Sequence, residues 1–331
     1  MQVPENFSRN WRFTDVKSHG ARVQAGHHLL GAHMSTAGGV HTAFARGMSI
    51  GCTTMQVFVK NNNRWSAPRL SEEDIQNYQT AEAKATITPV IAHAAYLINL
   101  CATNASVLNR SRKAFLDELN RCEAFGIKAL VFHPGAHIGA GENEGINLIA
   151  ESLNTIHLQS EGCRVISALE CTAGQGTAIG YRFEHLQSII DRVEQKHRMG
   201  VCLDTCHLFA SGYDIGTEEG WNTCVGAFND IVGLQRLVAI HMNDSKRELG
   251  SRVDRHEHIG KGRIGLAGFA AMMTDPRLAD IPKILETPKS EDMHEDVENM
   301  RRLLSLTRRR TRRNPETEVP TRNPCRKDRV A

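Results

Sequence analysis

The feature that most constrains the fold of this chain is a regular alternation of short apolar runs with longer amphipathic stretches, from about residue 28 to residue 306. Eight runs have the length and the nearly continuous hydrophobicity of strands buried on both faces: 28–34, 53–59, 88–93, 129–133, 164–170, 200–204, 237–242 and 281–286. The stretches between them carry apolar residues at the three- and four-residue spacing of helices: 71–84, 111–125, 145–159, 183–197, 217–232 and 291–306, with shorter segments after Gly39 and at 266–273.

Eight strands that alternate with eight helices predict an α/β fold, namely a parallel TIM (β/α)8 barrel formed by a single domain over residues 27–306. A doubly wound open sheet is the alternative, and the number of strands favours the barrel. The flanking residues, 1–26 and 307–331, are expected to be flexible tails, and the basic C-terminal tail is expected to be disordered.

The charge of the chain is unevenly distributed. Residues 301–331 contain eleven Lys and Arg against three acidic residues, whereas residues 1–300 contain 29 Lys and Arg against 34 Asp and Glu, a net charge of −5. The run Arg308-Arg309-Arg310-Thr311-Arg312-Arg313 is typical of a nucleic-acid-binding patch or a nuclear import signal. A solvated tail without such a role is the alternative.

The composition also argues against several classes of protein. No apolar run approaches the roughly 18 residues of a transmembrane helix, and the polar first 26 residues lack the apolar centre of a secretory signal. Nine cysteines without a C-x-x-C pair indicate a reducing compartment rather than a disulfide framework. We therefore expect an intracellular protein with no membrane partner, cytoplasmic if the source is bacterial and nuclear if it is eukaryotic.

Histidines and carboxylates gather where the predicted strands end. In a parallel barrel, the C-terminal ends of all strands open onto one side, where active sites form. Five histidines and four carboxylates lie at these ends or in the loops that follow them: His93, His133, Glu170, Asp204, His207, His241, Asp254, His256 and Glu286. We therefore expect these side chains to converge at one mouth of the barrel.

Each of these residues, taken alone, has an ordinary structural explanation. A single histidine at a strand end is more often a hydrogen-bonded core residue than a metal ligand, and Asp204 could cap the segment that follows it. Together, however, buried imidazoles and carboxylates are costly without partners or metal ions. Nine ligands suffice for about three divalent ions, and their mixture favours zinc or manganese. Three such ions outweigh four carboxylates in charge, which suits an anionic substrate such as a phosphate.

Longer motifs connect these candidate ligands to a known family. Seven of them follow one another along residues 28–300: Gly31-Ala32-His33-Met34-Ser35, Tyr96-Leu97-Ile98-Asn99-Leu100, Phe132-His133-Pro134-Gly135, Thr172-Ala173-Gly174-Gln175-Gly176, Leu203-Asp204-Thr205-Cys206-His207, His241-Met242-Asn243-Asp244-Ser245-Lys246 and Gly250-Ser251-Arg252-Val253-Asp254-Arg255-His256. In this order they resemble the endonuclease IV family, the zinc-dependent apurinic/apyrimidinic endonucleases of base-excision repair. The resemblance implies a TIM barrel that binds three zinc ions, and it covers neither tail.

The resemblance also implies which residues share an ion. Glu170 would bridge the first two of three ligand sets: His93, His133 and Glu170; Glu170, Asp204, His241 and Glu286; and His207, Asp254 and His256. Manganese is an alternative to zinc at one of these sites.

The activity that the resemblance implies is hydrolysis of the phosphodiester bond 5′ to abasic sites in duplex DNA. The products would be a 3′-hydroxyl and a 5′-deoxyribose phosphate, and the family also trims blocked 3′ ends. A metal-activated hydroxide would attack phosphorus, and the third ion would neutralise the charge that develops on the phosphate or the leaving oxygen. Glu170 and Glu286 are the expected catalytic residues, and the expected enzyme is a monomeric hydrolase whose partner is DNA.

Four residues are expected to contact DNA. Tyr96 matches a family position that enters the helix near the lesion, and residues 60–65 correspond to a DNA-probing loop. Well-known members carry Arg-Gln before the Trp of this loop, whereas this chain has Asn63 and Arg64, so Arg64 is the candidate for the probing arginine. Arg255 lies in the loop that carries candidate ligands. Cys171 also departs from the family, because it replaces an Asn that is common after the bridging Glu.

Two other functions are compatible with parts of this pattern. A metal-dependent sugar isomerase or epimerase would use a related barrel with similar ligands at its strand ends, but with fewer ions and without the Asp254-Arg255-His256 loop. A DNA-binding barrel that has lost catalysis is less compatible, because all nine candidate ligands are present.

Overall fold

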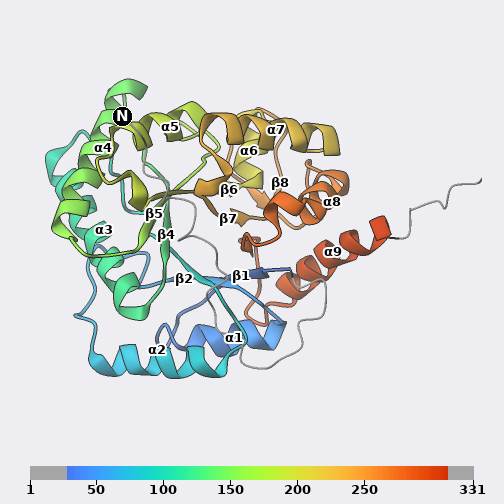
Figure 1. Ribbon diagram of the computed structural model, residues 1–331, viewed down its shortest axis with the longest axis horizontal. Coiled ribbons are helices and arrows are strands. Elements are labelled where there is room, and N and C mark those ends of the chain that lie inside the picture. The colour runs from blue at the N-terminus through green and yellow to red at the C-terminus, as the bar shows by residue number, and fades with distance from the viewer. Residues whose placement is uncertain (1–27, 312–331) are drawn as a thin grey trace, which may run out of the picture.

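The structure of the protein, a computed structural model, describes residues 28–311 and contains a closed barrel of eight parallel strands. Each strand pairs with the strands before and after it in the barrel, and the last pairs with the first (Figure 1). The strands are β1 (Leu30–Met34), β2 (Met55–Phe58), β3 (Val90–His93), β4 (Ala129–Phe132), β5 (Ile166–Glu170), β6 (Met199–Asp204), β7 (Leu237–His241) and β10 (Lys283–Leu285). The predicted TIM barrel is therefore confirmed, and the open sheet is excluded.

Helices surround the barrel on the outside (Figure 1). Eight of them follow the strands in the predicted alternation: α1 (Thr42–Ile50), α2 (Glu72–Lys84), α3 (Ala105–Phe125), α4 (Glu142–Gln159), α5 (Phe183–Arg192), α7 (Glu218–Ile231), α8 (Leu266–Thr274) and α9 (His294–Thr311). Helix α2 begins at a capping box, in which the Ser71 side chain accepts from the backbone N–H of Asp74 and the Asp74 side chain accepts from that of Ser71. Residues 28–311 also contain three short 3-10 turns: Lys196–Arg198, Leu234–Arg236 and Pro276–Leu278.

The structure differs from the predicted elements in several places; α3 begins at Ala105 rather than at 111, for example, and α5 ends at Arg192 rather than at 197. A short helix, α6 (Thr205–Ser211), follows β6 directly, because the Asp204 side chain accepts from the backbone N–H of His207 at 2.8 Å and caps it. A two-stranded antiparallel hairpin, β8 (Asp244–Ser245) with β9 (His256–Glu257), orders the long loop after β7. Helix α9 continues past residue 306, the expected end of the barrel domain, to Thr311.

The side chains of the strands alternate between two apolar clusters, which explains where polar groups can lie. One cluster, which includes Leu130, Phe132 and Leu169, also contains residues of the surrounding helices and lies outside the barrel. The other contains only strand residues, among them Ile91 and Ala168, and fills the interior. Because side chains two apart along a strand share a face, the residues two positions further along β3, β5, β6 and β7 also face the interior, at its C-terminal end: His93, Glu170, Asp204 and His241.

The predictions about the two tails, a membrane-spanning helix and the cysteines can be compared with the structure only over residues 28–311. Residues 1–27 and 312–331, which include most of both expected tails, lie outside the described residues. Within the described part, no helix is both long and apolar enough to cross a membrane. The eight cysteines of the described part are all free thiols.

Candidate metal centre

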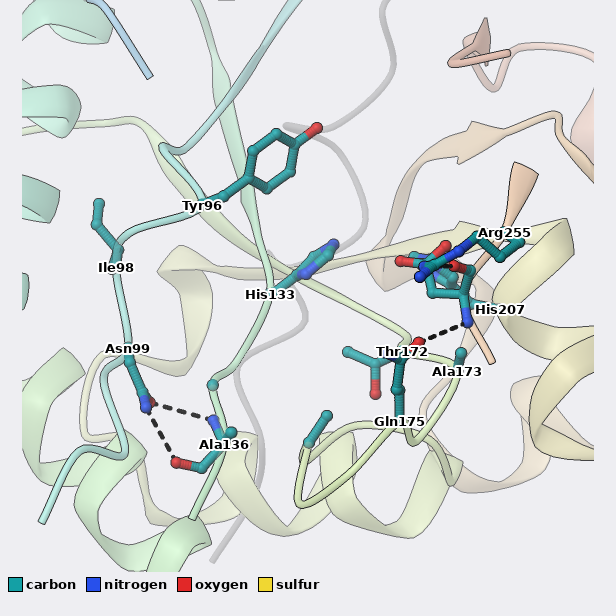
Figure 2. A pocket seen from close by; sticks show the side chains of 13 residues that line it. Tyr96, Ile98, Asn99, His133, Ala136, Thr172, Ala173, Gln175, His207 and Arg255 are labelled. Atoms are coloured by element: carbon teal, nitrogen blue, oxygen red, sulfur yellow. Dashed lines mark hydrogen bonds and ion pairs between the residues drawn. The ribbon is translucent and has the colours of Figure 1, made fainter. Parts of the chain in front are cut away.

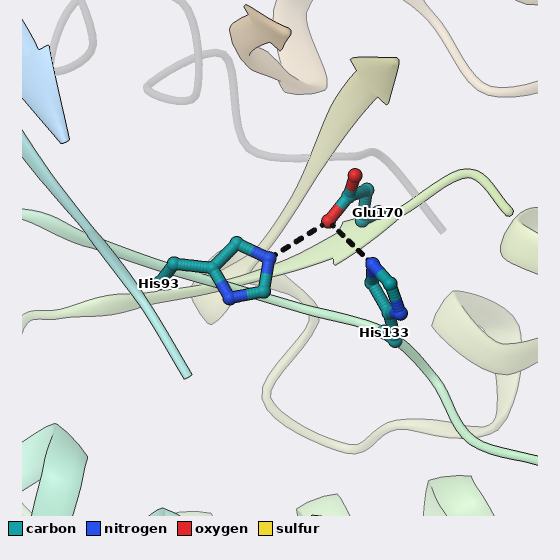
Figure 3. Close-up of side chains that lie close together, drawn as sticks. All are labelled: His93, His133 and Glu170. Carbon is teal, nitrogen blue, oxygen red and sulfur yellow. Dashed lines mark hydrogen bonds and ion pairs between the residues drawn. The ribbon is translucent and has the colours of Figure 1, made fainter. Parts of the chain in front are cut away.

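The first group of candidate ligands joins three neighbouring strands at the mouth of the barrel. The Nε2 atoms of His93 and His133 lie 2.9 and 3.1 Å from the same carboxylate oxygen, Oε2 of Glu170 (Figure 3). His93 and Glu170 are buried, whereas the side chain of His133 is 36% exposed, so this group opens toward solvent on one side. The structure therefore brings together the three residues expected at the first ion.

The second group surrounds a single imidazole nitrogen. Nδ1 of His241 lies 3.0 Å from Oε1 of Glu170, 3.2 Å from Oε2 of Glu286 and 3.8 Å from Oδ2 of Asp204. One oxygen of Glu170 thus faces the first group and the other faces the second. Ligand atoms of all four residues lie within 4.8 Å of one another, as the binding of one ion requires.

The third group lies at the edge of the mouth. Nε2 of His207 is 3.1 Å from Oδ2 of Asp254, and Nε2 of His256 is 3.4 Å from Oδ1 of Asp254 and 3.6 Å from Oδ2 of Asp204. His207 comes from α6, whereas the other two come from the loop after β7. This group therefore adjoins the second one through Asp204.

Backbone and side-chain contacts hold this long loop against the barrel. The Asp244 carboxylate accepts from the backbone N–H groups of Gly260, Gly262 and Ile264 at 2.8–3.0 Å. Oε1 of Gln175, in the loop after β5, accepts from the backbone N–H of Asp254 at 3.0 Å. These contacts explain how a loop can present Asp254 at a defined position. The Asp244 carboxylate holds the two ends of the loop together, and Gln175 holds the backbone of Asp254 itself.

The electrostatics of the site favour a bound cation. Burial by itself would raise the pKa of Glu170, but the His241 and His133 imidazoles beside it hold that pKa well below its usual range. Within the described part of the chain, Nε2 of His207 and Nε2 of His256 are buried without a partner in hydrogen-bond geometry. Ionised carboxylates and buried imidazole nitrogens without a hydrogen bond are the donors that zinc prefers, so the residues fit divalent ions.

The orientation of three imidazoles is set by backbone carbonyls. Nδ1 of His93, His207 and His256 lies 2.7, 2.9 and 3.1 Å from the carbonyl oxygens of Ala94, Cys171 and Glu286. A carbonyl can only accept, so each Nδ1 donates, which leaves each Nε2 as the nitrogen that would bind an ion at the site.

A pocket of about 380 Å³ lies beside the first and third groups (Figure 2). Its wall includes Tyr96, His133, His207, Asp254 and Arg255. In Figure 2 the Tyr96 ring stands over the pocket on one side and Arg255 lies on the other. A substrate in this pocket would therefore touch an aromatic ring, a cation and the candidate metal ligands together.

Comparison with known proteins decides which family has this arrangement. A protein family described as Xylose isomerase-like TIM barrel matches residues 44–309. The chain is 47% identical over 277 residues to "Probable endonuclease 4" of Chloroflexus aurantiacus (strain J-10-fl), covering 84% of this chain and 97% of the relative. It is 44% identical over 292 residues to "Probable endonuclease 4" of Geobacter sulfurreducens, covering 88% and 99%. This chain belongs to the endonuclease IV family.

Solved structures agree with membership of the endonuclease IV family. Endonuclease IV from Thermus thermophilus has a TM-score of 0.75 and 32% identity, covering 85% of this chain and 99% of that one. A D-tagatose 3-epimerase-like protein has a TM-score of 0.64 at 15% identity, covering 85% and 99%. The second likeness shows only that the fold is shared.

The residues expected at the DNA interface of an endonuclease IV lie around the mouth. Tyr96 is 59% exposed and packs edge-on against Phe58, with ring centroids 5.6 Å apart. Asn63 and Arg64 are exposed in a turn after β2, and the exposed Arg255 borders the pocket. These positions are accessible to a duplex laid across the mouth, and their contacts with DNA stay predictions.

Two buried polar residues of the site were missed in the sequence. Gln56, on β2, contacts both His241 and Glu286. Asn243 donates to Asp204 at 2.6 Å and accepts from the backbone N–H of Glu286 at 2.8 Å. Gln56 did carry a signal, because an amide inside the apolar run Met55–Phe58 needs buried partners.

The departure at Cys171 leaves the candidate ligands in place. The buried Sγ of Cys171 accepts from the backbone N–H of Asp204 at 3.1 Å. The thiol therefore holds the backbone at the end of β6, from which the Asp204 side chain reaches the candidate metal site, and it is not itself a candidate ligand.

Proposed function

We propose that this protein is a DNA-repair endonuclease that hydrolyses the phosphodiester bond 5′ to abasic sites in duplex DNA. The products would be a 3′-hydroxyl and a 5′-deoxyribose phosphate, and blocked 3′ ends would be trimmed at the same site. One observation carries the proposal: Oε2 of Glu170 lies 2.9 Å from His93, whereas its Oε1 lies 3.0 Å from His241. A buried carboxylate with its two oxygens in two separate ligand groups suits a bridge between two cations.

Three zinc ions per chain would be held by the three groups described above, with manganese as an alternative at one. Bound there, the ions would activate water and neutralise charge on the phosphate at neutral pH. The second group lies deep in the mouth, whereas the first opens toward solvent at His133 and the third lies at the edge with Asp254 38% exposed. This arrangement suits a phosphodiester that enters from the pocket side.

The side chains of the protein itself have separate tasks in this proposal. Glu170 and Glu286, each with an oxygen within 3.2 Å of His241, would hold the inner ligand groups and would steer a proton of the attacking water. Tyr96 offers an exposed aromatic ring to fill the space that an extruded nucleotide leaves. Arg64 and Arg255 add positive charge at the rim, where the DNA backbone would pass.

A sugar isomerase or epimerase remains the alternative, since barrels of that kind share the fold. The third group of ligands favours the nuclease, because it adds a further ion site beside a pocket lined with a cation and an aromatic ring. We further propose that the enzyme acts inside the cell, where free thiols such as the eight of the described residues stay reduced, and that it acts as a monomer.

The deciding experiment uses a duplex with one tetrahydrofuran abasic analogue, which cannot undergo β-elimination. The purified zinc-loaded protein is incubated with it in buffer without EDTA and without added magnesium, and zinc is measured on the same sample. Incision 5′ to the analogue with close to three zinc ions per chain is the expected result. No incision, with only one or two metal ions bound, would contradict the proposal and direct attention to aldose and ketose substrates.

A further inference from the structure

A buried amide lies among the candidate ligands although no strand-end pattern places it there. Gln56 is in the middle of β2 (Met55–Phe58) and is completely buried. Its neighbours Met55 and Val57 belong to the apolar cluster outside the barrel, so Gln56 faces the interior. Its amide therefore reaches the level of the inner ligand groups from the side of the barrel that supplies none of the nine ligands.

Both ends of this amide are used. Nε2 of Gln56 donates to Oε1 of Glu286 at 2.6 Å, and Oε1 of Gln56 lies 2.8 Å from Nε2 of His241. An ionised carboxylate can only accept, so the amide nitrogen must face Glu286 and the amide oxygen must face His241. The amide nitrogen also lies 3.0 Å from Nδ1 of His33, so the amide contacts one more side chain at the mouth.

This orientation determines the tautomer of His241. Because the amide oxygen can only accept, Nε2 of His241 donates to it, which leaves Nδ1 as the nitrogen that would bind an ion held among Glu170, Asp204 and Glu286. His93, His207 and His256 have the opposite tautomer, and backbone carbonyls set it. A carbonyl is present whatever the sequence, whereas the orientation of His241 depends on one replaceable side chain.

We propose that Gln56 is a positioning residue for the second metal ion, because it fixes the tautomer of His241 and the rotamer of Glu286 together. The inference rests on the proposed zinc centre and adds to it a residue that binds no ion. An imidazole ligand whose second nitrogen loses its partner binds its metal roughly 10- to 100-fold more weakly. Loss of the amide would therefore release one ion of the three and leave the other two groups intact.

A purely structural role makes a different prediction. If the amide only fills space and satisfies its own hydrogen bonds, its replacement lowers the free energy of unfolding but changes no individual zinc site. Two variants separate these roles. Gln56→Met keeps the length of the side chain without its hydrogen bonds, and Gln56→Glu keeps an acceptor for His241 while opposing Glu286 with a like charge.

Thr54→Val is the matched control. Thr54 lies just before β2, is fully buried, and donates from its hydroxyl to the carbonyl of Pro89 at 2.6 Å, away from the candidate ligands. Its replacement removes one buried hydrogen bond from the same segment, whereas Gln56→Met removes the several contacts of the amide, which lie at a different place in the barrel.

The test is made on zinc-loaded proteins and uses no DNA. Zinc release to a chromogenic chelator is followed over time, and long-range ¹H–¹⁵N spectra of histidine-labelled protein report the tautomer of His241. We expect Gln56→Met to release one zinc ion at least tenfold faster than wild type and to change the His241 signals. Gln56→Glu should keep those signals but also release one ion faster, and Thr54→Val should match wild type in both measurements.

Some outcomes would overturn the inference. Wild-type release rates and unchanged His241 signals in a folded Gln56→Met protein would do so. Equally faster release of all three zinc ions from Gln56→Met would indicate a general loosening of the barrel instead. The same faster release from Thr54→Val would indicate this too. If Gln56→Met does not fold, a Gln56→Glu protein with wild-type release rates would be sufficient to reject the inference. Wild-type protein that holds three zinc ions without cutting abasic DNA would contradict the proposed activity alone.

Discussion

Nζ of Lys60 lies 3.0 Å from Oε1 of Glu118, and both side chains are almost completely buried. The same ammonium donates to the carbonyl of Arg64 at 3.0 Å, and the Glu118 carboxylate accepts from the backbone N–H of Ala95 at 3.1 Å. Ala95 precedes Tyr96 in the chain. One ion pair therefore holds the loop with Arg64 and the loop with Tyr96 against α3.

Lys60→Met should weaken both the fold and the binding of DNA. Breaking a buried pair leaves a carboxylate uncompensated and lowers the free energy of unfolding by about 3 kcal/mol or more. Since both loops lose an anchor, KM for abasic duplex should rise more than kcat falls. Urea unfolding and steady-state kinetics check the two effects, and unchanged KM would refute the role of the pair in placing the loops.

The double variant Lys60→Met/Glu118→Gln provides the control for stability. It removes the unpaired charge but keeps an oxygen for the Ala95 N–H, so most of the lost stability should return. KM should stay high, because Arg64 has still lost its partner. Recovery of KM together with stability would show that the pair acts through folding alone.

Glu170→Gln should fold but lose at least about 100-fold in turnover, because an amide is a poor bridge between two cations. Incision of the tetrahydrofuran duplex is measured, with circular dichroism to show that the variant is folded. Glu123→Gln is a suitable control, since this carboxylate on α3 contacts Arg164 far from the mouth. Substantial residual incision by Glu170→Gln would argue against the bridging role.

His256→Ala should reduce bound zinc by about one ion per chain, because the third group would keep only His207 and Asp254. Metal analysis after exhaustive dialysis measures the loss. His294→Ala serves for comparison, since His294 belongs to a cluster with Asp292 and Glu295 that has two exposed members and shares no residue with the three ligand groups. Zinc content equal to wild type in His256→Ala would rule out its role as a ligand.

Protonation of His157 should lower the free energy of unfolding in mild acid. It is buried on α4 with Nε2 2.9 Å from Oγ of Ser167, and burial together with nearby Arg198 and His197 lowers its pKa from 6.5 to about 3. The unfolded chain therefore binds the proton first, so the contribution is complete above about pH 6.5 and is lost as pH falls toward 3.

His157→Gln removes this titration and can keep a hydrogen bond to Ser167. Between pH 6 and pH 4, its unfolding free energy should fall less steeply than that of wild type, by up to about 1.4 kcal/mol per pH unit. Urea unfolding at several pH values gives both slopes, and protonation of the metal ligands affects both proteins alike. Parallel slopes would show that His157 is protonated in the folded state as well.

Deletion of residues 312–331 should weaken DNA binding at low salt but preserve turnover at saturating DNA. The deletion begins after Thr311 so that α9 stays complete, and it removes six Lys and Arg against three acidic residues. Fewer phosphate contacts also predict a shallower dependence of affinity on salt concentration. Fluorescence anisotropy across a salt series measures this, and identical affinity and slope would mean that the segment does not contact DNA.

Much of the barrel could be predicted because its determinants are local. Buried parallel strands require continuous apolar runs, and each predicted run overlaps one observed strand. Helix α6 was missed because its seven residues, which include His207, are too few for a periodic pattern, and it depends on the cap at Asp204. Helix α9 reaches Thr311, beyond the expected end at 306, since a basic run is compatible with a helix although it lacks an apolar stripe.

The sequence by itself determined the order of the strands, the family and the set of residues able to bind metal. Apolar runs, strand ends and motifs are each formed by neighbouring residues, so they are visible in the sequence alone. Only the tertiary structure decided that the two oxygens of Glu170 face different groups and that Gln56 lies against His241 and Glu286. Closure of the barrel brings β2, β5, β7 and β10 together across its interior. Which atoms then meet depends on side-chain rotamers and hydrogen-bond directions, which residue spacing does not encode.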